Sequence, residues 1–288
     1  MTVVLFCGGL GLRLRDHAHQ VPKPMVKIGG APILRHLMRY YASYGHGHFV
    51  LCLGYGAEVV RRHFAGSPDC VTVETLPDEA VRVHLRSDEL GRCTVDLVPT
   101  GHEASIGERL RAARRYITQD IFLANYADGL SDLDLPHFLA RFAESGAAAG
   151  LITVRSPSTL HLVSVGSGGL VEEVQPAAAT DLRVNGGFFA MRRQIFDELV
   201  PGEDLVGGLF PRLVAGRRLF GYCHDGFWAC MDTPKDRRLL EDMDARGHAP
   251  WKVWLGGGGA ARPGTSPAQS LLGVRVELAP TTTDVGLR

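Results

Sequence analysis

The chain has no excess of charge of either sign and no long apolar run. Its 31 lysine and arginine residues match 31 aspartate and glutamate residues, so the formal net charge is zero. A neutral chain has no general attraction for nucleic acid or for an acidic membrane, and we expect neither partner. The apolar runs are only as long as strands, and the first residues read directly as a strand without a basic-then-apolar leader, so we expect no membrane span and no signal peptide.

Paired cysteines are also missing. None of the six cysteines forms a Cys-x-x-Cys pair with another, so neither a zinc site nor a disulfide framework is indicated. Several of them stand in apolar segments, and we expect buried free thiols in a cytoplasmic protein. Apolar residues make up 45% of the 288 positions, which is enough for a substantial core in one large domain or two small ones.

A glycine-rich turn stands near the start of the chain. The apolar run from Val3 to Phe6 predicts a buried strand, and it is followed by three glycines, Gly8, Gly9 and Gly11. Glycine lets backbone N–H groups approach a bound phosphate with no Cβ in the way, and successive N–H groups in such a turn form a concave site for an anion. By themselves, the glycines are equally typical of a tight turn without a ligand.

Two cations after this turn favour a ligand. Arg13 offers a permanently charged fork of donors, and Lys23 offers a point charge between two prolines that stiffen the chain. The turn is not a classical P-loop, which has Lys-Ser or Lys-Thr after its last glycine. It is not a dinucleotide fingerprint either, because Leu14 replaces the third glycine and no acidic residue follows about 20 residues further on. We interpret it as a cradle for a nucleoside triphosphate.

Strand and helix patterns alternate along the rest of the chain. Hydrophobic periodicity predicts helices over 32–44, 57–64, 136–142 and 234–245, a helix ending at 116, and strands over 49–53, 71–74, 81–85, 94–98, 121–125, 147–154, 162–165, 169–174, 219–223 and up to 191. This order predicts an α/β fold with a doubly wound, mostly parallel, Rossmann-like sheet. In such sheets, ligands bind beyond the carboxyl ends of the strands.

An aspartate follows one of these strands. Asp128 comes shortly after the apolar run 121–125, where a carboxylate can face bound phosphates. Mg²⁺ prefers hard oxygen ligands, usually one or two carboxylates with substrate phosphates and water; the alternative is an ordinary Asp-Gly turn. Asp132 and Asp134 stand just before a helix with Pro136 in its first turn, and we interpret both as helix caps.

Together, these motifs resemble a known family. Gly-Gly-Leu-Gly-Leu-Arg-Leu at 8–14 with Pro-Lys-Pro-Met at 22–25 is similar to the N-terminal signature of sugar-1-phosphate nucleotidyltransferases, and the run 22–36 looks most like glucose-1-phosphate cytidylyltransferases. The resemblance covers roughly residues 2–254. It implies one domain over 1–254, with a nucleotide-binding half at 1–154 and a smaller, β-rich sugar-binding half at 155–254, followed by a flexible tail at 255–288.

The resemblance also implies a reaction and its participants. CMP would pass from CTP to a hexose 1-phosphate, with glucose 1-phosphate as the expected acceptor, giving a CDP-sugar and pyrophosphate. The implied cofactor is Mg²⁺, the implied partners are these small molecules, and relatives are often homo-oligomers.

The resemblance assigns the functional roles known in the family to the matching positions of this chain. The resemblance implies catalytic roles for Arg13 and Lys23, nucleotide binding by Gly8, Gly9, Gly11, Gly107 and Arg109, sugar binding by Asn185 and Gly186, and metal binding by Asp128 and Asp232. Plainer alternatives stay open at three of them. Arg109 also fits a solvated helix residue, Asn185 a turn entering a strand, and Asp232 support of the helix that starts after Thr233 and Pro234.

The chain also departs from the family's pattern. The phosphate-holding lysine of a Glu-Lys-Pro motif is missing, because the chain reads Val-Gln-Pro at 174–176. Ile106 and Glu108 depart from the usual base-contacting segment, and Gly207-Gly208 stands near the expected sugar pocket. One alternative keeps the chemistry with another triphosphate or with a modified sugar or cyclitol phosphate, as in aminoglycoside-type antibiotic biosynthesis. Another is a catalytically silent nucleotide-binding subunit.

Overall fold

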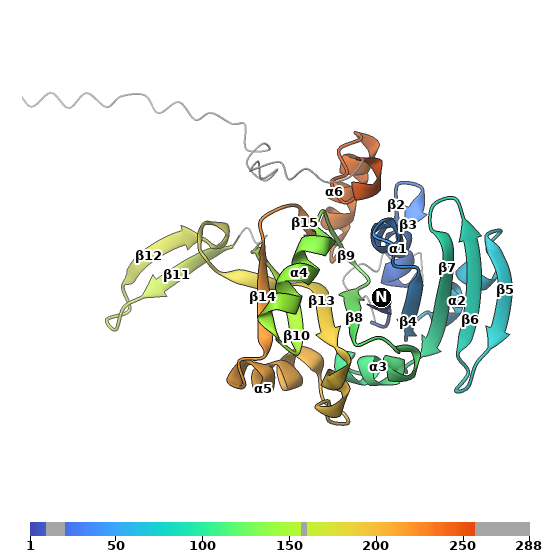
Figure 1. The fold of residues 1–288 in the computed structure, drawn as a ribbon. Coiled ribbons are helices and arrows are strands. Elements are labelled where there is room, and N and C mark those ends of the chain that lie inside the picture. Colours follow the sequence, from blue (N-terminus) through green and yellow to red (C-terminus); the bar gives the residue numbers. More distant parts are fainter. Residues whose placement is uncertain (10–20, 157–159, 257–288) are drawn as a thin grey trace, which may run out of the picture.

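The computed structural model describes residues 1–9, 21–156 and 160–256 (Figure 1). Two predicted site residues, Gly11 and Arg13, therefore lie outside the described residues, as does most of the predicted tail at 255–288. None of the described helices is long and apolar enough to cross a membrane.

A nine-stranded sheet forms the centre of the molecule. Its spatial order is β14 (Leu219–His224), β10 (Ala149–Arg155), β13 (Arg183–Arg192), β8 (Ile121–Tyr126), β1 (Thr2–Phe6), β4 (His48–Leu53), β7 (Gly91–Pro99), β6 (Val81–Ser87) and β5 (Cys70–Thr75). Three two-stranded sheets accompany it: β2 (Lys27–Ile28) with β3 (Ala31–Pro32), β9 (Gly129–Ser131) with β15 (Trp228–Cys230), and β11 (His161–Val165) with β12 (Val171–Pro176).

Helices cover both sides of the central sheet (Figure 1). The α-helices are α1 (Ile33–Ser43), α2 (Ala57–Ala65), α3 (Ile106–Ala113), α4 (Leu135–Ser145), α5 (Phe210–Ala215) and α6 (Pro234–Ala245). Short turns of 3₁₀-helix include η2 (Lys23–Met25) and η7 (Val253–Leu255), and η6 (Leu205–Leu209) is a π-helical turn. The predicted fold class is confirmed.

The order of the strands reverses at β1. Strand β1 pairs in parallel with β4 on one side and with β8 on the other. The chain runs from β1 to the adjacent β4, crosses to the far edge of the sheet at β5, comes back inward through β6 to β7, and then passes to the opposite side of β1 as β8. Antiparallel strands β13, β6 and β5 complete the flanks. Ligands of doubly wound sheets bind at such a reversal, which lies here between the carboxyl ends of β1 and β8.

Alternate residues of β1 enter two separate cores. Val3 and Leu5 pack with side chains of α1, α2 and α4, whereas Val4 and Phe6 pack with side chains of α3 and α5. All four side chains are nearly or fully inaccessible to solvent. A strand that is buried on both faces needs a continuous apolar run, which is the pattern that predicted it.

Capping boxes set the start of two helices. Ser105 and Glu108 exchange hydrogen bonds with each other's backbone at the start of α3. Thr233 and Asp236 do the same at α6, where Pro234 occupies the first turn. Each box satisfies two backbone N–H groups that a helix start otherwise leaves without a partner. The predicted start of the last helix is therefore confirmed.

The two aspartates before α4 differ from each other. The side chain of Asp134 accepts a hydrogen bond from the backbone N–H of His137, so its predicted cap role is confirmed. The cap role predicted for Asp132 is wrong, because its Oδ1 lies 3.1 Å from Nε2 of the buried His224. Asp134 alone caps the start of α4, so the carboxylate of Asp132 contacts His224 of β14 instead.

The cysteines are free thiols, as predicted, but not all of them are buried. Cys7, Cys52 and Cys93 are buried, and Cys70 and Cys230 are half-buried. Cys223 is exposed, because β14 is the outermost strand at its end of the sheet. The segment around Trp251 packs against the domain, with its indole buried beside His36 of α1.

Candidate active site

Lys23 lies at the centre of the candidate site. It begins η2, where Pro22 and Pro24 flank it, and its side chain is 15% exposed. Its ammonium donates a hydrogen bond of 2.5 Å to Asp128 and a second of 2.5 Å to Asp232. Burial by itself lowers the pKa of Lys23, but the charge of Asp128 and the hydrogen bonds to both carboxylates raise it overall. The lysine therefore stays protonated between the two aspartates.

A small sheet brings the two aspartates together. Asp128 lies in the turn between β8 and β9, and Asp232 follows β15 directly. Strand β15 pairs with β9, and the backbone N–H of Met231 donates to the carbonyl of Asp128 at 2.9 Å. The N–H of Asp232 also donates to Asp236 in the capping box of α6. Both carboxylates are thus held by ordered backbone.

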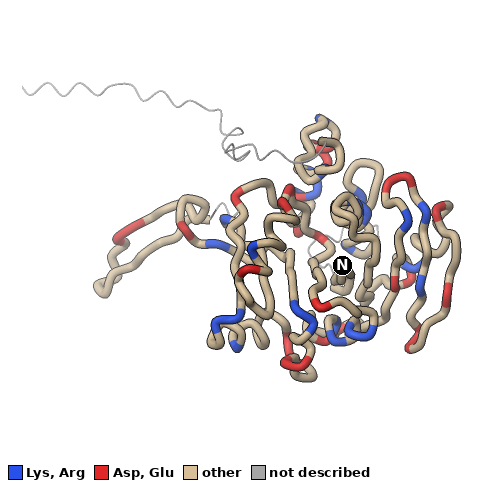
Figure 2. The backbone as a smooth tube through the Cα atoms, viewed as in Figure 1, with Lys and Arg blue, Asp and Glu red and all other residues tan. Residues whose placement is uncertain are grey.

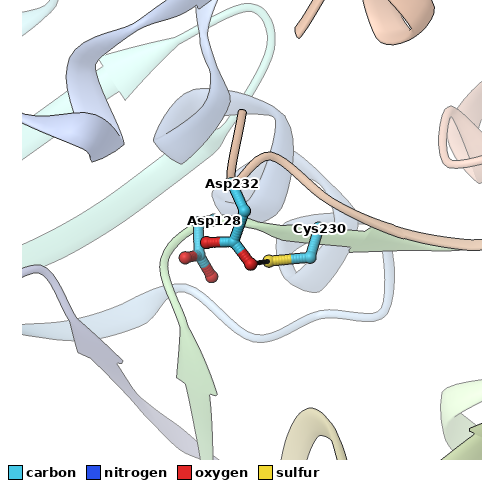
Figure 3. A group of neighbouring side chains, drawn as sticks. All are labelled: Asp128, Cys230 and Asp232. Carbon is cyan, nitrogen blue, oxygen red and sulfur yellow. Dashed lines mark hydrogen bonds between the residues drawn. The ribbon is translucent and has the colours of Figure 1, made fainter. Parts of the chain in front are cut away.

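A third donor lies beside them. The carboxylates of Asp128 and Asp232 and the thiol of Cys230 place one oxygen or sulfur atom each within 4.8 Å of the others (Figure 3). The thiol hydrogen-bonds Asp232 at 3.5 Å. Burial and the neighbouring charge of Asp128 raise the pKa of Cys230, so the sulfur remains a neutral thiol.

A pocket opens between the ends of β1 and β8, with a volume of about 170 Å³. Its lining comes from the glycine turn, from η2, from the first residue of α3 and from the end of β8: Phe6, Cys7, Gly8, Gly9, Lys23, Pro24, Ile106, Tyr126, Ala127 and Asp128. This is the position at which the strand order reverses. The structure therefore places Gly8, Gly9, Lys23 and Asp128 around one cavity.

Arg109 supports the glycine turn from behind. Its side chain is 2% exposed, and its guanidinium donates to the hydroxyl of Thr100 at 2.6 Å and to the carbonyls of Gly101 and His102. A Cβ at Gly8 would lie only 2.0 Å from Nη1 of Arg109. The alternative of a solvated helix residue is wrong, because the guanidinium packs inward under the turn.

Gly107 lies where α3 meets the segment before η6. A Cβ at this position would lie 2.1 Å from the carbonyl oxygen of Glu203. The same carbonyl accepts a hydrogen bond from Ser105. Asp204 then caps η6 by accepting from the N–H groups of Val206 and Gly207. The Gly207-Gly208 pair therefore belongs to a tight turn beside the pocket wall.

The predicted sugar-binding residues stand at the start of the buried part of β13. Asn185 accepts a hydrogen bond from the backbone N–H of Gly187, and the carbonyl of Gly186 accepts one from the indole of Trp228 at 2.7 Å. Burial raises the pKa of Tyr126 to about 12, while a hydrogen bond with Asn185 opposes that rise. Tyr126 thus links these residues to the pocket that it lines.

Sequence comparison with known proteins identifies the family of this chain. No protein-family model matches the chain. Glucose-1-phosphate cytidylyltransferase of Salmonella typhimurium is 31% identical over 257 residues, covering 88% of this chain and 100% of that protein, and the enzyme of Salmonella typhi gives the same values. The chain belongs to the glucose-1-phosphate cytidylyltransferase family.

Solved structures share the fold of this chain, although their sequence identity to it is lower than that of the Salmonella proteins. A Bacillus anthracis protein, described as a glucose-1-phosphate thymidylyltransferase, aligns with a TM-score of 0.60 at 14% identity, covering 84% of this chain and 94% of that one. HddC from Yersinia pseudotuberculosis aligns with a TM-score of 0.56 at 18% identity, covering 84% and 99%.

The donor atoms fit the divalent metal that the cytidylyltransferase family implies. Two carboxylates, 23% and 44% exposed, converge on one position, and the ammonium of Lys23 shows that this position attracts a cation. Mg²⁺ needs only one or two carboxylates, because phosphates and water complete its octahedral shell. The neutral, soft thiol of Cys230 does not suit Mg²⁺, so the fit rests on Asp128 and Asp232.

Sequence reasoning missed several residues of this candidate site, and three of them stand out. Tyr126 ends β8 and lines the pocket, and Ile106 lines it from the start of α3. Cys230 joins the two aspartates. Tyr126 and Cys230 each stand two residues before a predicted metal aspartate, and alternation along a strand end would have been a usable signal. The only sequence signal at Ile106 is its departure from the family's pattern.

Proposed function

We propose that this protein transfers the cytidylyl group of CTP to glucose 1-phosphate, giving CDP-glucose and pyrophosphate. Membership of the cytidylyltransferase family supports the substrates. The observation that carries the chemistry is the meeting of Lys23 with Asp128 and Asp232 at a glycine turn. A lysine with two carboxylates can neutralise charge during phosphoryl transfer, which a protein that only binds nucleotide does not need. The three residues therefore favour an active cytidylyltransferase over a catalytically silent subunit.

The reaction is an in-line displacement at phosphorus. An oxygen of the sugar phosphate attacks the α-phosphorus of CTP, and the bond to pyrophosphate breaks. The attacking phosphate is already ionised at neutral pH, so no general base is needed. The protein's contribution is to align the two substrates and to balance negative charge.

Lys23 is the residue that we propose to act on the transferred phosphate. Its ammonium lines the pocket and stays charged. When CTP enters, the ammonium turns from the carboxylates to the α-phosphate and stabilises the charge that develops there. We further propose that Gly8, Gly9 and Gly11 donate backbone N–H groups to the leaving pyrophosphate and that Arg13 balances its charge.

Asp128 and Asp232 are the residues that we propose to hold Mg²⁺. A bound Mg²⁺ ion supplies positive charge that offsets the phosphates of the nucleotide. The two carboxylates would hold this charge beside Lys23, which lines the pocket. Cys230 stays a neutral neighbour of Asp232.

The remaining assignments concern the base and the sugar. We propose that Gly107 and Arg109 shape the wall where the nucleotide lies, because Arg109 packs directly behind Gly8 and Gly107 follows the pocket residue Ile106 in α3. Asn185 and Gly186 bind the sugar through amide and backbone groups, next to Tyr126. This assigns residues 1–154 to the nucleotide and 155–254 to the sugar. The cytoplasmic location stays a prediction from composition, and homo-oligomer formation stays a prediction from the family resemblance.

Pyrophosphate release tests the proposal. The wild-type chain is incubated with Mg²⁺ and glucose 1-phosphate, and each nucleoside triphosphate is tried separately. We expect release with CTP and little with UTP, GTP, ATP or dTTP. In Asp128→Asn we expect a loss of about 10²-fold or more, because the charge that holds Mg²⁺ is gone.

Asp134→Asn is the matched control for that variant. Asp134 caps α4, and asparagine is an equally good cap, so turnover should stay near wild type. If the protein binds CTP but releases no pyrophosphate with glucose 1-phosphate and any triphosphate, glucose 1-phosphate is not its acceptor. Full activity of Asp128→Asn would contradict the role of this carboxylate.

A further inference from the structure

Cys230 is a donor at the candidate site that the proposed reaction does not use. It lies on β15 and is half-buried, and its thiol donates a hydrogen bond of 3.5 Å to Asp232. Its sulfur and one oxygen each of Asp128 and Asp232 lie within 4.8 Å of one another. Figure 3 shows the three side chains gathered at one position. Two hard oxygens and one soft sulfur therefore converge there.

The pairing of β9 with β15 fixes this arrangement. Cys230 lies opposite Gly129, the residue after Asp128. Alternate residues of an extended chain point to the same side, so Cys230 and Asp232 share one side, while Met231 between them is buried in a core cluster. The backbone N–H of Met231 donates to the carbonyl of Asp128 at 2.9 Å. The three donors are thus held by one hydrogen-bonded piece of backbone.

This set of donors suits Zn²⁺ better than Mg²⁺. Zinc bonds are about 2.3 Å to sulfur and about 2.0–2.2 Å to a carboxylate oxygen, so two donors on one zinc ion are at most about 4.5 Å apart. That span is close to the 4.8 Å within which the three donor atoms lie. Three protein ligands with one open position are typical of a zinc site that also takes water or substrate. A thiolate is a soft ligand that favours Zn²⁺ over Mg²⁺ and Mn²⁺.

No second group of this kind competes within the part of the chain that the structure describes. Among residues 1–9, 21–156 and 160–256, this is the only group of three or more His, Cys, Asp or Glu side chains with donor atoms so close together. Acidic and basic residues are interspersed along the described chain (Figure 2). A thiophilic ion therefore has one preferred position among these residues.

The ammonium of Lys23 marks this position as one that favours positive charge. It lies 2.5 Å from an oxygen of each carboxylate, so a divalent ion must displace it to bind both. An ion that bonds only to oxygen gains two protein ligands in this exchange. An ion that also bonds to the sulfur of Cys230 gains a third. The exchange therefore favours a thiophilic ion.

We propose that Asp128, Cys230 and Asp232 form a zinc site, which takes up Zn²⁺ in place of the ammonium of Lys23 and thereby blocks the active site. The sulfur–zinc bond forms as the S–H bond breaks, and the proton passes to water, so nothing is oxidised or reduced. Mg²⁺ leaves several of its six positions to phosphates and water, whereas four-coordinate Zn²⁺ with three protein ligands leaves one. The block rests on the proposed function, but the zinc site does not.

Co²⁺ tests the site, because it binds in zinc sites and absorbs light according to its ligands. The full chain is titrated without nucleotide or sugar. We expect sulfur-to-cobalt charge-transfer absorption in the wild type and none in Cys230→Ser. Cys223→Ser is the matched control, since it removes the exposed thiol of β14 and should keep the absorption. Competition with a chromophoric chelator should show Zn²⁺ affinity falling about tenfold or more in Cys230→Ser, with Mn²⁺ affinity within about twofold of wild type.

Three results would overturn the zinc site: no charge-transfer absorption in the wild type, its persistence in Cys230→Ser, or equal losses of Zn²⁺ and Mn²⁺ affinity in that variant. The last would show that Cys230 only supports Asp232. Pyrophosphate release at fixed Mg²⁺ tests the block, and added Zn²⁺ should inhibit the wild type more strongly than Cys230→Ser. Equal inhibition would overturn the block. A chain without turnover before Zn²⁺ is added would contradict the proposed reaction, while the cobalt and zinc titrations would still decide the site.

Discussion

At the scale of single residues, the position of Lys23 determines how the site responds to cations. Its ammonium lies 2.5 Å from each of two carboxylates that together suit a divalent ion. A metal that enters without a nucleotide must displace this ammonium. Under the proposed function, a metal that arrives with triphosphate would meet no such competition, because the phosphates would draw Lys23 away. We therefore expect the lysine to link metal binding to nucleotide binding.

Lys23→Met should therefore bind a divalent cation more tightly in the absence of nucleotide. We expect about tenfold tighter binding of Mn²⁺, which corresponds to about 1.4 kcal/mol, measured by calorimetry or electron paramagnetic resonance. Turnover with CTP should fall by about 10²-fold to 10³-fold, because the charge at the transferred phosphate is lost.

Lys27→Met is the control for that change, since Lys27 is an exposed lysine on the neighbouring β2. Its cation affinity and turnover should match the wild type. Equal Mn²⁺ affinity in the wild type and in Lys23→Met would show that the ammonium does not compete with the metal.

A second prediction at this scale concerns two adjacent glycines. In Gly8→Ala the new methyl group would lie 2.0 Å from Nη1 and 2.2 Å from Cζ of the buried Arg109. We expect a loss of about 1–3 kcal/mol in the free energy of unfolding. Gly9→Ala meets no atom within 4 Å and should change stability by less than about 0.5 kcal/mol. Denaturant unfolding without ligand measures both, and equal losses would contradict the packing of Arg109 under the turn.

At the scale of elements, the start of α6 positions one of the two carboxylates. Asp236 accepts from the N–H groups of both Thr233 and Asp232, while its own N–H bonds to the hydroxyl of Thr233. The capping box therefore does more than begin a helix. It holds the backbone that places Asp232 opposite Asp128.

Thr233→Ala should weaken both the helix start and the cation site. We expect a loss of about 1 kcal/mol in the free energy of unfolding and severalfold weaker binding of Mn²⁺ in the presence of CTP. Thr233→Ser keeps the hydroxyl and should restore both quantities. A variant that loses stability but keeps full cation affinity would show that the cap does not position Asp232.

At the scale of the whole molecule, we expect three histidines to make the free energy of unfolding depend on pH. Burial lowers the pKa of His36, His46 and His63, and that of His46 falls from its ordinary value of 6.5 to about 4. Between these pKa values, His46 is protonated in the unfolded chain but neutral in the folded state. The stabilising contribution is complete above pH 6.5 and is lost as the pH falls from there toward about 4.

Urea unfolding at several values of pH checks this expectation. The free energy of unfolding should decline between pH 7 and pH 4, and His46→Gln should decline less steeply over the same range. Parallel declines in the two proteins would show that His46 does not contribute to the loss.

Local patterns predicted most elements. The helices α1, α2 and α6 and the central strands begin and end within one to three residues of their predicted bounds. The signals were periodicity, prolines and caps, which act between near neighbours in the chain. They misassigned Asp132, because its partner His224 lies on β14, far along the chain. A side chain that contacts a distant strand leaves no local pattern.

The sequence by itself therefore determined the alternating α/β order, the glycine turn after a doubly buried strand, and the presence of a lysine and aspartates at strand and helix ends. Only the tertiary structure decided that Lys23 meets Asp128, 105 residues away, and Asp232, 209 residues away. It also decided that Arg109 turns inward and that Asp132 meets His224. The reason is physical: periodicity reports which face of an element is apolar, whereas the order and pairing of strands determine which ends of the elements meet.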